Sequence, residues 1–404
     1  MPKTKFITIL AGIGLYLIST GISYAAFSYF QKGQIDLLPS PVIEIPTTEQ
    51  RAKIDLSAPK TELCPLNAKL YTQAEKDIWS TRRPLGIMIE NHEEARPQSG
   101  LSKADVIYEA VAEGGITRFL AIYLCGASAE DVQVGPVRSA RTYFLDWISE
   151  YGISPLYVHV GGANCDPSTG SGCAGGAKAD ALGQIQKYGW QGYNDINQFS
   201  AGFPTFWRDK DRLGRPVATE HTMYSSTDKL WEVAASRGLT YKDKDDQVWN
   251  ETFIPWKFTE PETEKTADEP VAPAYLFWDN QFAQQYKIEW TYDPVNNQYL
   301  RSNAGQPHLD LNYNQQLAAK NVVVAFMVES QANDGYEKNL HLLYKTTGTG
   351  KAVIFKNGQG YDATWSKKSR TDRTVFKDTT GKEFEFNPGL IWISILPTGN
   401  KIEY

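Results

Sequence analysis

The stretch 105–124, DVIYEAVAEGGITRFLAIYL, decides how the first half of this chain folds. Apolar and β-branched residues fill both sides of Gly114-Gly115, a dipeptide suited to a tight turn with positive φ. We therefore predict two strands, 105–113 and 116–124, joined as a hairpin by the two glycines. This hairpin is the most specific structural prediction that the sequence supports.

The register of the hairpin then predicts which side chains share a face. With the two glycines as the loop, Val111 is expected to face Arg118 and Glu109 to face Leu120. Because side chains alternate along a strand, Arg118 should lie diagonally between Glu109 and Glu113 on an otherwise apolar surface. One interpretation is an ion network that fixes the register. The other is a polar site at the edge of a cleft.

Outward from the hairpin, the first half of the chain mixes strands and helices. Residues 84–90 and 155–160 are predicted strands, and 142–151 and 228–237 are predicted helices. Ser226 and Thr227 are candidate caps for the second helix, which Gly238 ends. We expect an α/β or α+β N-terminal domain.

The second half of the chain is mostly strand-like. Short runs rich in β-branched and aromatic residues predict strands at 287–292, 320–327, 340–344, 352–355 and 390–396. Residues 317–319 are expected to form one helical turn. The pattern predicts a smaller, mainly-β C-terminal domain.

Proline-rich stretches separate the predicted parts. Residues 31–80 are predicted to be a flexible tether, and the acidic stretch 255–273 a linker or exposed insertion. The predicted organisation is a cytoplasmic N-terminus at 1–5, a transmembrane anchor at 6–30, the tether at 31–80, the N-terminal domain at 81–254, the linker at 255–273 and the C-terminal domain at 274–404.

The uncharged apolar run Phe6–Phe30 predicts a membrane anchor. Twenty-five helical residues span about 37 Å, enough to cross a bilayer core. Lys3 and Lys5 before it favour a cytoplasmic N-terminus and an extracytoplasmic body. A signal peptide cleaved near Ser23–Ala26 and a buried core helix are the alternatives. We expect a single-pass cell-membrane protein.

Charge and cysteine content restrict the partners and the compartment. The 404 residues carry a formal net charge of -6, which disfavours nucleic acid as a partner. The four cysteines are expected to form disulfides in an oxidising space, because no Cys-x-x-Cys spacing suggests a metal. Cys165 and Cys173 could pair across a flexible stretch, leaving Cys64 for Cys125, but three connectivities are open.

The segment 134–141, VGPVRSAR, leads directly into the predicted helix at Thr142. A helix N-terminus offers unpaired N–H groups and partial positive charge. Ser139 as a cap, with Arg138 and Arg141, would complete an anion-binding pocket. In the alternative interpretation these arginines pair with acidic side chains, namely Glu109, Glu113 or Asp146.

A second charged segment, Phe206–Arg212, precedes His221. It is either a solvated loop or a rim that closes over a ligand. Arg208 and His221 are therefore further candidate binding residues.

Three histidines of the first half are candidates for chemistry. His92, His159 and His221 could ligate a metal with Glu90 or Asp209, but their spacing gives no support, so we expect neither a metal nor a cofactor. A general base is the alternative role, and His159 is the candidate.

Several of these segments together resemble the YerB-like family of bacterial envelope lipoproteins, which is defined by a two-part domain of unknown function. The resemblance covers about 81–404 and implies two domains, an envelope location and no established reaction. The chain departs from the family by lacking a lipobox cysteine before Cys64. The matching segments are 83–92, 95–101, 104–109, 113–119, 134–141 and 206–209, with similar stretches around 361–365, 374–378 and 388–392.

Two functions follow from these residues. The first is a non-catalytic envelope protein that binds an anionic cell-wall component or a partner protein through Arg118, Arg138 and Arg141. The second is an enzyme acting on a phosphate- or carboxylate-bearing envelope glycan or lipid-linked precursor, with Glu109 or Glu113 as acid/base. We favour the first, because no nucleophile or metal motif is evident.

Overall fold

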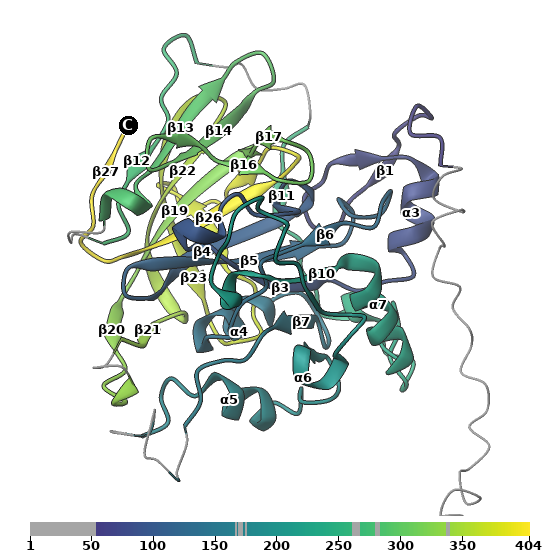
Figure 1. The fold of residues 1–404 in the computed structure, drawn as a ribbon. Helices are drawn as coiled ribbons and strands as arrows, with labels where there is room; N and C mark the ends of the chain where they lie inside the picture. Colours follow the sequence, from purple (N-terminus) through teal and green to yellow (C-terminus); the bar gives the residue numbers. More distant parts are fainter. Residues whose placement is uncertain are drawn as a thin grey trace, which may run out of the picture. The chain divides into compact units, whose positions relative to one another are not determined.

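A ten-stranded sheet runs through the molecule in the computed structural model (Figure 1). The structure describes residues 54–404 except 166–167, 169–172, 174–175, 261–266, 279–282 and 337–339. The predicted anchor at 6–30 lies outside the described residues, and within them no helix is long and apolar enough to span a membrane.

The strands of this central sheet come from both halves of the chain. Their order is β24-β23-β22-β19-β26-β4-β5-β3-β7-β8. Their bounds are β3 Leu85–Glu90, β4 Val106–Glu113, β5 Ile116–Tyr123, β7 Leu156–His159, β8 Asp195–Asn197, β19 Asn321–Met327, β22 Gly348–Lys356, β23 Gln359–Lys367, β24 Val375–Asp378 and β26 Ile391–Pro397.

The two halves meet at β26, close to the C-terminus. This strand pairs in parallel with β19 on one side and with β4 on the other. Parallel strands in the middle of a sheet are buried on both faces and read as continuous apolar runs. Ile391–Leu396 is apolar except for Ser394, and every residue in it is buried.

The hairpin β4–β5 confirms the predicted strands and their glycine turn, in which Gly114 and Gly115 both have positive φ. The predicted register is wrong beyond the turn. A β-bulge between Val111 and Glu113 shifts the pairing by one residue, so that Arg118 pairs with Ala110. A one-residue shift moves side chains to the other face. The bulge therefore separates Glu109 from Arg118.

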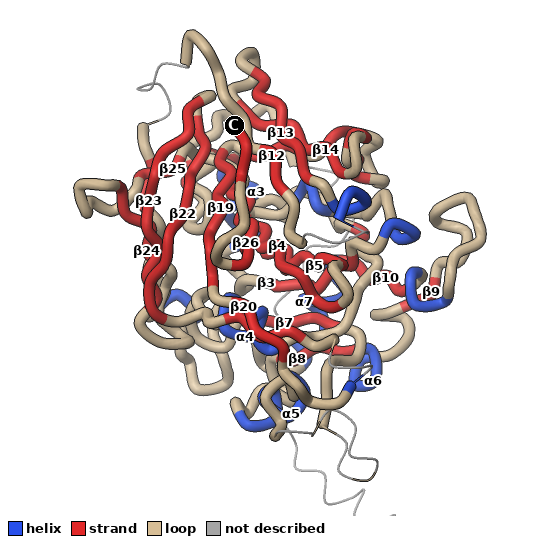
Figure 2. Tube along the Cα trace, turned by 90° about the vertical axis from the view of Figure 1, so that its left-hand side faces the viewer, coloured by secondary structure: helices blue, strands red, loops and turns tan. Residues whose placement is uncertain are grey.

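Short helices and ribbons surround the sheet. In Figures 1 and 2, α4 to α7 gather around its β3–β7–β8 end. The helices are α3 Gln73–Trp79, α4 Thr142–Ile148, α5 Ala181–Lys187, α6 Gln198–Ala201 and α7 Thr227–Ser236. Small sheets join β6 Gln133–Val134, β9 Trp207–Arg208 and β10 Met223–Ser226; β11 Lys257–Phe258 and β25 Glu385–Phe386; β16 Leu309–Asp310 and β17 Gln315–Gln316; and β20 Glu329–Gln331 and β21 Leu342–Tyr344.

A second sheet lies toward the opposite end and belongs entirely to the second half. The helical turn predicted at 317–319 is wrong, because β18 Ala318–Ala319 pairs with β14 in this sheet. With helices so short, the described fold is mainly β rather than clearly α/β. The strands of this sheet are β12 Ala274–Tyr275, β13 Ile288–Asp293, β14 Gln298–Asn303, β15 Gln306–Pro307, β18 and β27 Ile402–Glu403.

The folded body begins earlier than the predicted tether allowed. β1 Glu62–Leu63 pairs with β2 Leu70–Tyr71, and α3 follows with a capping box between Thr72 and Glu75. Leu66 and Trp79 are buried in the main core. The tether prediction is therefore wrong for residues 62–79.

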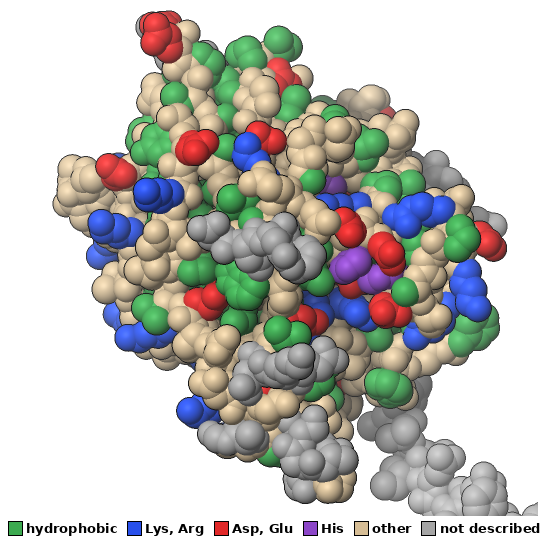
Figure 3. Space-filling model, turned by 60° about the vertical axis from the view of Figure 1, so that its left-hand side comes forward, with side chains coloured by type: hydrophobic (Ala, Val, Ile, Leu, Met, Phe, Trp, Pro, Cys, Tyr) green, Lys and Arg blue, Asp and Glu red, His purple; other side chains and the backbone are tan. Residues whose placement is uncertain are grey.

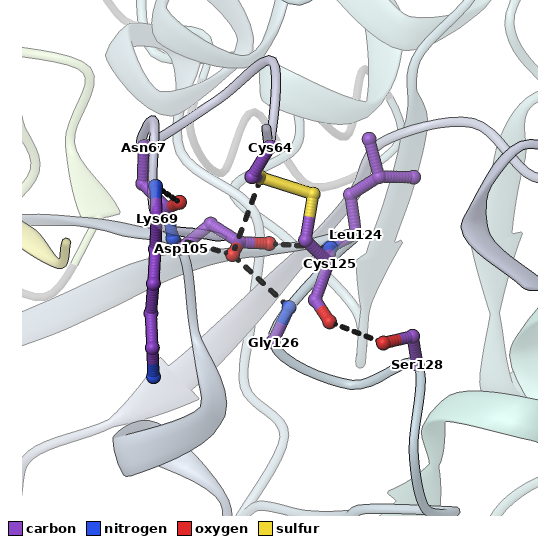
Figure 4. The surroundings of a disulfide bond; sticks show 8 residues. All are labelled: Cys64, Asn67, Lys69, Asp105, Leu124, Cys125, Gly126 and Ser128. Carbon is purple, nitrogen blue, oxygen red and sulfur yellow. Dashed lines mark hydrogen bonds between the residues drawn. A yellow bond between two sulfur atoms is a disulfide. The ribbon is translucent and has the colours of Figure 1, made fainter. Parts of the chain in front are cut away.

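Both disulfides are formed as Cys64–Cys125 and Cys165–Cys173. The first ties the β1–β2 segment to the end of β5 beside buried Asp105 (Figure 4). The Asp105 carboxylate accepts backbone N–H bonds from Leu124, Cys125 and Gly126. Since a disulfide sulfur has no hydrogen to donate, the Cys64 sulfur 3.9 Å from Asp105 Oδ1 is only a contact.

Candidate functional site

Two of the candidate binding arginines share one carboxylate at the turn end of the hairpin. Arg118 and Arg141 each donate to a different oxygen of Glu113, and Arg118 also donates to the carbonyl of Ser139 at 3.0 Å. The arginine side chains are only 4% and 6% exposed. Burial opposes ionisation of Glu113, but the two guanidinium charges outweigh it and lower its pKa to about 2. Pairing of Arg141 with Glu113, one of the alternatives, is confirmed.

The third arginine is held by a different acid. Arg138 Nε lies 3.1 Å from Oε1 of Glu90, the last residue of β3. The other oxygen of Glu90 lies 2.8 Å from His221 Nδ1. Glu90 also pairs across the sheet with Arg118, so the two ion networks are neighbours. Arg118, Arg138, Arg141, Glu90 and Glu113 are called the arginine site below.

The arginine site has an excess of positive charge and of hydrogen-bond donors. Three guanidinium groups face two carboxylates. The Nε groups of Arg118 and Arg141 are buried without a hydrogen-bond acceptor among the described residues, whereas Arg138 Nε is paired with Glu90. Buried donors without a partner are costly, so a ligand or water that accepts from them is favoured. The Arg138 side chain is 24% exposed, which makes it the accessible member.

The helix-terminus pocket predicted at Thr142 is absent from the described structure. Helix α4 has only seven residues, and its N-cap position is Arg141, without a side-chain cap bond. Ser139 lies before the cap and contributes its carbonyl to Arg118 instead. The arginines thus act as a charge cluster and not through a helix end.

Glu109, a candidate acid/base, lies away from the arginine site. It is fully buried and receives two 2.9 Å bonds from Arg301 Nη2, together with bonds from Thr117 and Trp392. Because these three side chains surround its oxygens, it has no access to a substrate. Its position follows from the bulge, which places it on the face opposite Arg118.

The hydrogen bonds of His159 and Arg208 also go to residues outside the arginine site. His159 is buried, and its nitrogens lie 2.6 Å from the Gly161 carbonyl and from Asp195 Oδ1. Since both partners are acceptors, neither nitrogen is free to take a proton from a substrate. Arg208 is exposed and donates to the Thr219 carbonyl at 2.5 Å. None of the candidate catalytic side chains Glu109, Glu113 and His159 is therefore free.

A buried network missed by sequence reasoning continues from Glu109 across the two halves. Arg301 donates to Nδ1 of His308, whose Nε2–H donates to Gln98 Oε1 at 2.5 Å. Burial and the charge of Arg301 hold the pKa of His308 well below its usual range, so it is neutral. Gln98 then donates to Asn91 Oδ1 at 3.0 Å. No spacing in the sequence indicates these pairings, which join residues up to 210 positions apart.

His92 and His221, two of the three histidines considered as metal ligands, lie together beside Glu90, whereas His159 pairs with Asp195. His92, His221 and Glu94 are called the histidine cluster below. His92 stacks on His221 with ring centroids 4.8 Å apart, and His221 Nε2 lies 3.4 Å from Glu94 Oε2. Figure 3 shows histidine at the surface with acidic and basic side chains around it. His92 is the histidine of the chain that is not buried. The signal available was local, because His92 and Glu94 directly follow the end of β3.

Two family models together match most of the chain. Residues 71–240 match the model of the "Protein of unknown function (DUF3048) N-terminal domain", and 278–393 match that of its C-terminal domain. The chain is 30% identical over 354 residues, 87% of this chain and 88% of the relative, to YerB of Bacillus subtilis (strain 168), whose name classes it provisionally as a lipoprotein. The crystal structure of Bacillus subtilis YerB is similar with a TM-score of 0.65 at 26% identity, covering 85% of this chain and all of that one.

Proposed function

Because this chain belongs to the DUF3048 family, we propose that it is a membrane-held envelope protein that binds an anionic partner through the arginine site. The segments that carry the family resemblance include all five residues of the arginine site. The lipoprotein name of the Bacillus relative supports an envelope location. The two disulfides agree with an oxidising compartment.

The proposed attachment differs from that of a lipoprotein. No cysteine precedes Cys64, so the apolar run Phe6–Phe30 would serve as the anchor in place of a lipid. We expect the mature protein to stay in the membrane pellet after an alkaline wash and to keep this segment in its intact mass. A mature chain that begins near Ala26 would contradict a retained anchor and support a cleaved signal.

The excess positive charge of the arginine site and the partial exposure of Arg138 carry the binding proposal. The buried ion pair Glu109–Arg301 differs from this site, because Arg301 is fully buried and cannot reach a ligand. Arg138 is partly exposed. The three arginines of the site face two carboxylates, which leaves one positive charge in excess. An anionic oxygen at this position would accept charge-assisted bonds, each stabilising by about 1.5–3 kcal/mol. Phosphate- or carboxylate-bearing wall polymers provide such oxygens.

The test is binding of Arg138→Gln to purified cell walls, with and without their anionic polymers. Glu90 keeps His221 as a partner in this variant, so the fold should be retained. We expect its affinity for complete walls, measured by co-sedimentation, to fall roughly tenfold, which corresponds to about 1.4 kcal/mol of binding free energy. Lys377→Gln is the matched control, because it removes one positive charge from an exposed position on β24. Equal loss in both variants, or in neither, would contradict a specific arginine site.

A further inference from the structure

Glu90 fixes one imidazole of the histidine cluster in an orientation suited to a ligand. A carboxylate only accepts, so His221 Nδ1 carries the proton in its 2.8 Å bond to Glu90 Oε2. When this ring is neutral, its lone pair is on Nε2, which faces Glu94. This is the arrangement by which carboxylates orient metal-binding histidines. His221 itself is buried, so its position is well restrained.

Two further groups that can act as metal ligands lie close to His221. One ligand atom each from His92, Glu94 and His221 lies within 4.8 Å of the others. A tetrahedral metal with bonds of about 2.0–2.2 Å holds its ligands roughly 3.4 Å apart, so the cluster needs to contract by about an ångström. Glu94 is 50% exposed and His92 is partly exposed, so both can move while His221 stays fixed.

The charges around the cluster favour a cation. Glu90 and Glu94 contact it directly, and the carboxylates of Glu93 and Glu220 act on its imidazoles through space. Arg138 is the opposing positive charge, and Glu90 already pairs with it. The four acidic groups therefore exceed the nearby positive charge.

We propose that His92, Glu94 and His221 form a binding site for one divalent transition-metal ion of the Zn²⁺ class. Two imidazoles and one carboxylate suit such ions, whereas Ca²⁺ and Mg²⁺ prefer oxygen ligands alone. Three protein ligands leave at least one coordination position for water or an anionic oxygen. Glu90 is a positioning residue in this site. The proposal does not depend on wall binding, although the two sites share Glu90.

The experiment uses the full-length chain in detergent, stripped of metal with a chelator and then dialysed. Equilibrium dialysis against micromolar Zn²⁺ should show one ion per chain. Titration with Co²⁺ should give visible absorption bands typical of low coordination number, and Zn²⁺ should abolish them. An excess of Ca²⁺ should not. Absence of stoichiometric binding to the unaltered chain would overturn the proposal.

Substitutions at two adjacent residues distinguish metal binding at the proposed site from nonspecific binding to surface carboxylates. Glu94→Gln removes a ligand and should weaken binding at least tenfold, while Glu93→Gln makes the same chemical change one position away and should alter it less than about twofold. Both residues are exposed, so folding is not at risk. His92→Ala should also remove the Co²⁺ bands. If Glu93→Gln and Glu94→Gln bind metal equally well, the ions bind elsewhere. The contacts of the histidine cluster would then be structural, without a metal.

Discussion

The position of Glu113 shows how one extra residue in a strand determines which charged side chains meet. Without the bulge, Glu109 and Glu113 would share a face, as their spacing suggests. With it, Glu113 joins Arg118 and Arg141, while Glu109 turns to Arg301 in the core. Bulges are not indicated by composition, so the sequence supplied the candidate residues but not their grouping.

The lowered pKa of Glu113 predicts an acid-sensitive contribution to stability. Its pKa is about 2 in the folded protein against an ordinary value of 4.5 for glutamate, so the folded state favours the ionised form. The stabilisation is present above about pH 4.5 and is lost as pH falls toward 2, in total on the order of 3 kcal/mol. Urea unfolding of Glu113→Gln should therefore show a weaker pH dependence between 4.5 and 2 than the unaltered chain. Parallel curves would contradict this.

The buried pair Glu109–Arg301 predicts a much larger effect. Arg301→Met leaves the Glu109 carboxylate buried without its bidentate partner, and we expect a loss of about 3–5 kcal/mol in the free energy of unfolding. Adding Glu109→Gln removes the unpaired charge and should recover part of that loss. Chemical denaturation of the single and double variants measures both. A double variant less stable than Arg301→Met would show that the charge is not the cause.

At the scale of elements, the N-terminal segment and the hairpin illustrate what local patterns can predict. The strands β3, β4, β5 and β26 were predicted within two residues, because apolar β-branched runs define them. The prolines and weak periodicity of the β1–β2–α3 segment predict a tether, because an attachment made by one disulfide and a few buried side chains leaves no local pattern. Long-range covalent and packing contacts do not show in local periodicity.

The disulfide Cys64–Cys125 should therefore contribute strongly to stability. It closes 61 residues of chain, and loop entropy gives about 4 kcal/mol for a loop of that size. We expect the double variant Cys64→Ala, Cys125→Ala to lose a comparable free energy of unfolding and its first protease-sensitive site to lie before α3. The bridge Cys165–Cys173 closes only eight residues, so the matching double variant should lose less. Equal losses of unfolding free energy in the two double variants would show that loop size does not determine how much each disulfide stabilises the fold.

At the scale of the whole molecule, the sequence indicated two parts, and the family models match two segments. The order of strands across the sheet was beyond prediction, because nothing in the run 391–397 says which strands lie beside it. The described residues from 54 to 404 form one compact unit. The Glu109–Arg301 network and the β4–β26 pairing both cross between the matched segments. The parts are thus distinct in sequence and continuous in structure.

This continuity predicts that neither matched segment folds alone. In 54–254 expressed by itself, β4 would lose β26 and expose a long apolar edge, and Glu109 would lose both Arg301 and Trp392. We expect this fragment to aggregate or to lack native hydrogen-exchange protection in β4 and β5. In 54–404, protection of β4 and of β26 should be lost at the same urea concentration, because each strand completes the other's hydrogen bonds. A protected fragment, or two separate transitions in the longer chain, would show instead that the sheet is assembled from two independently stable halves.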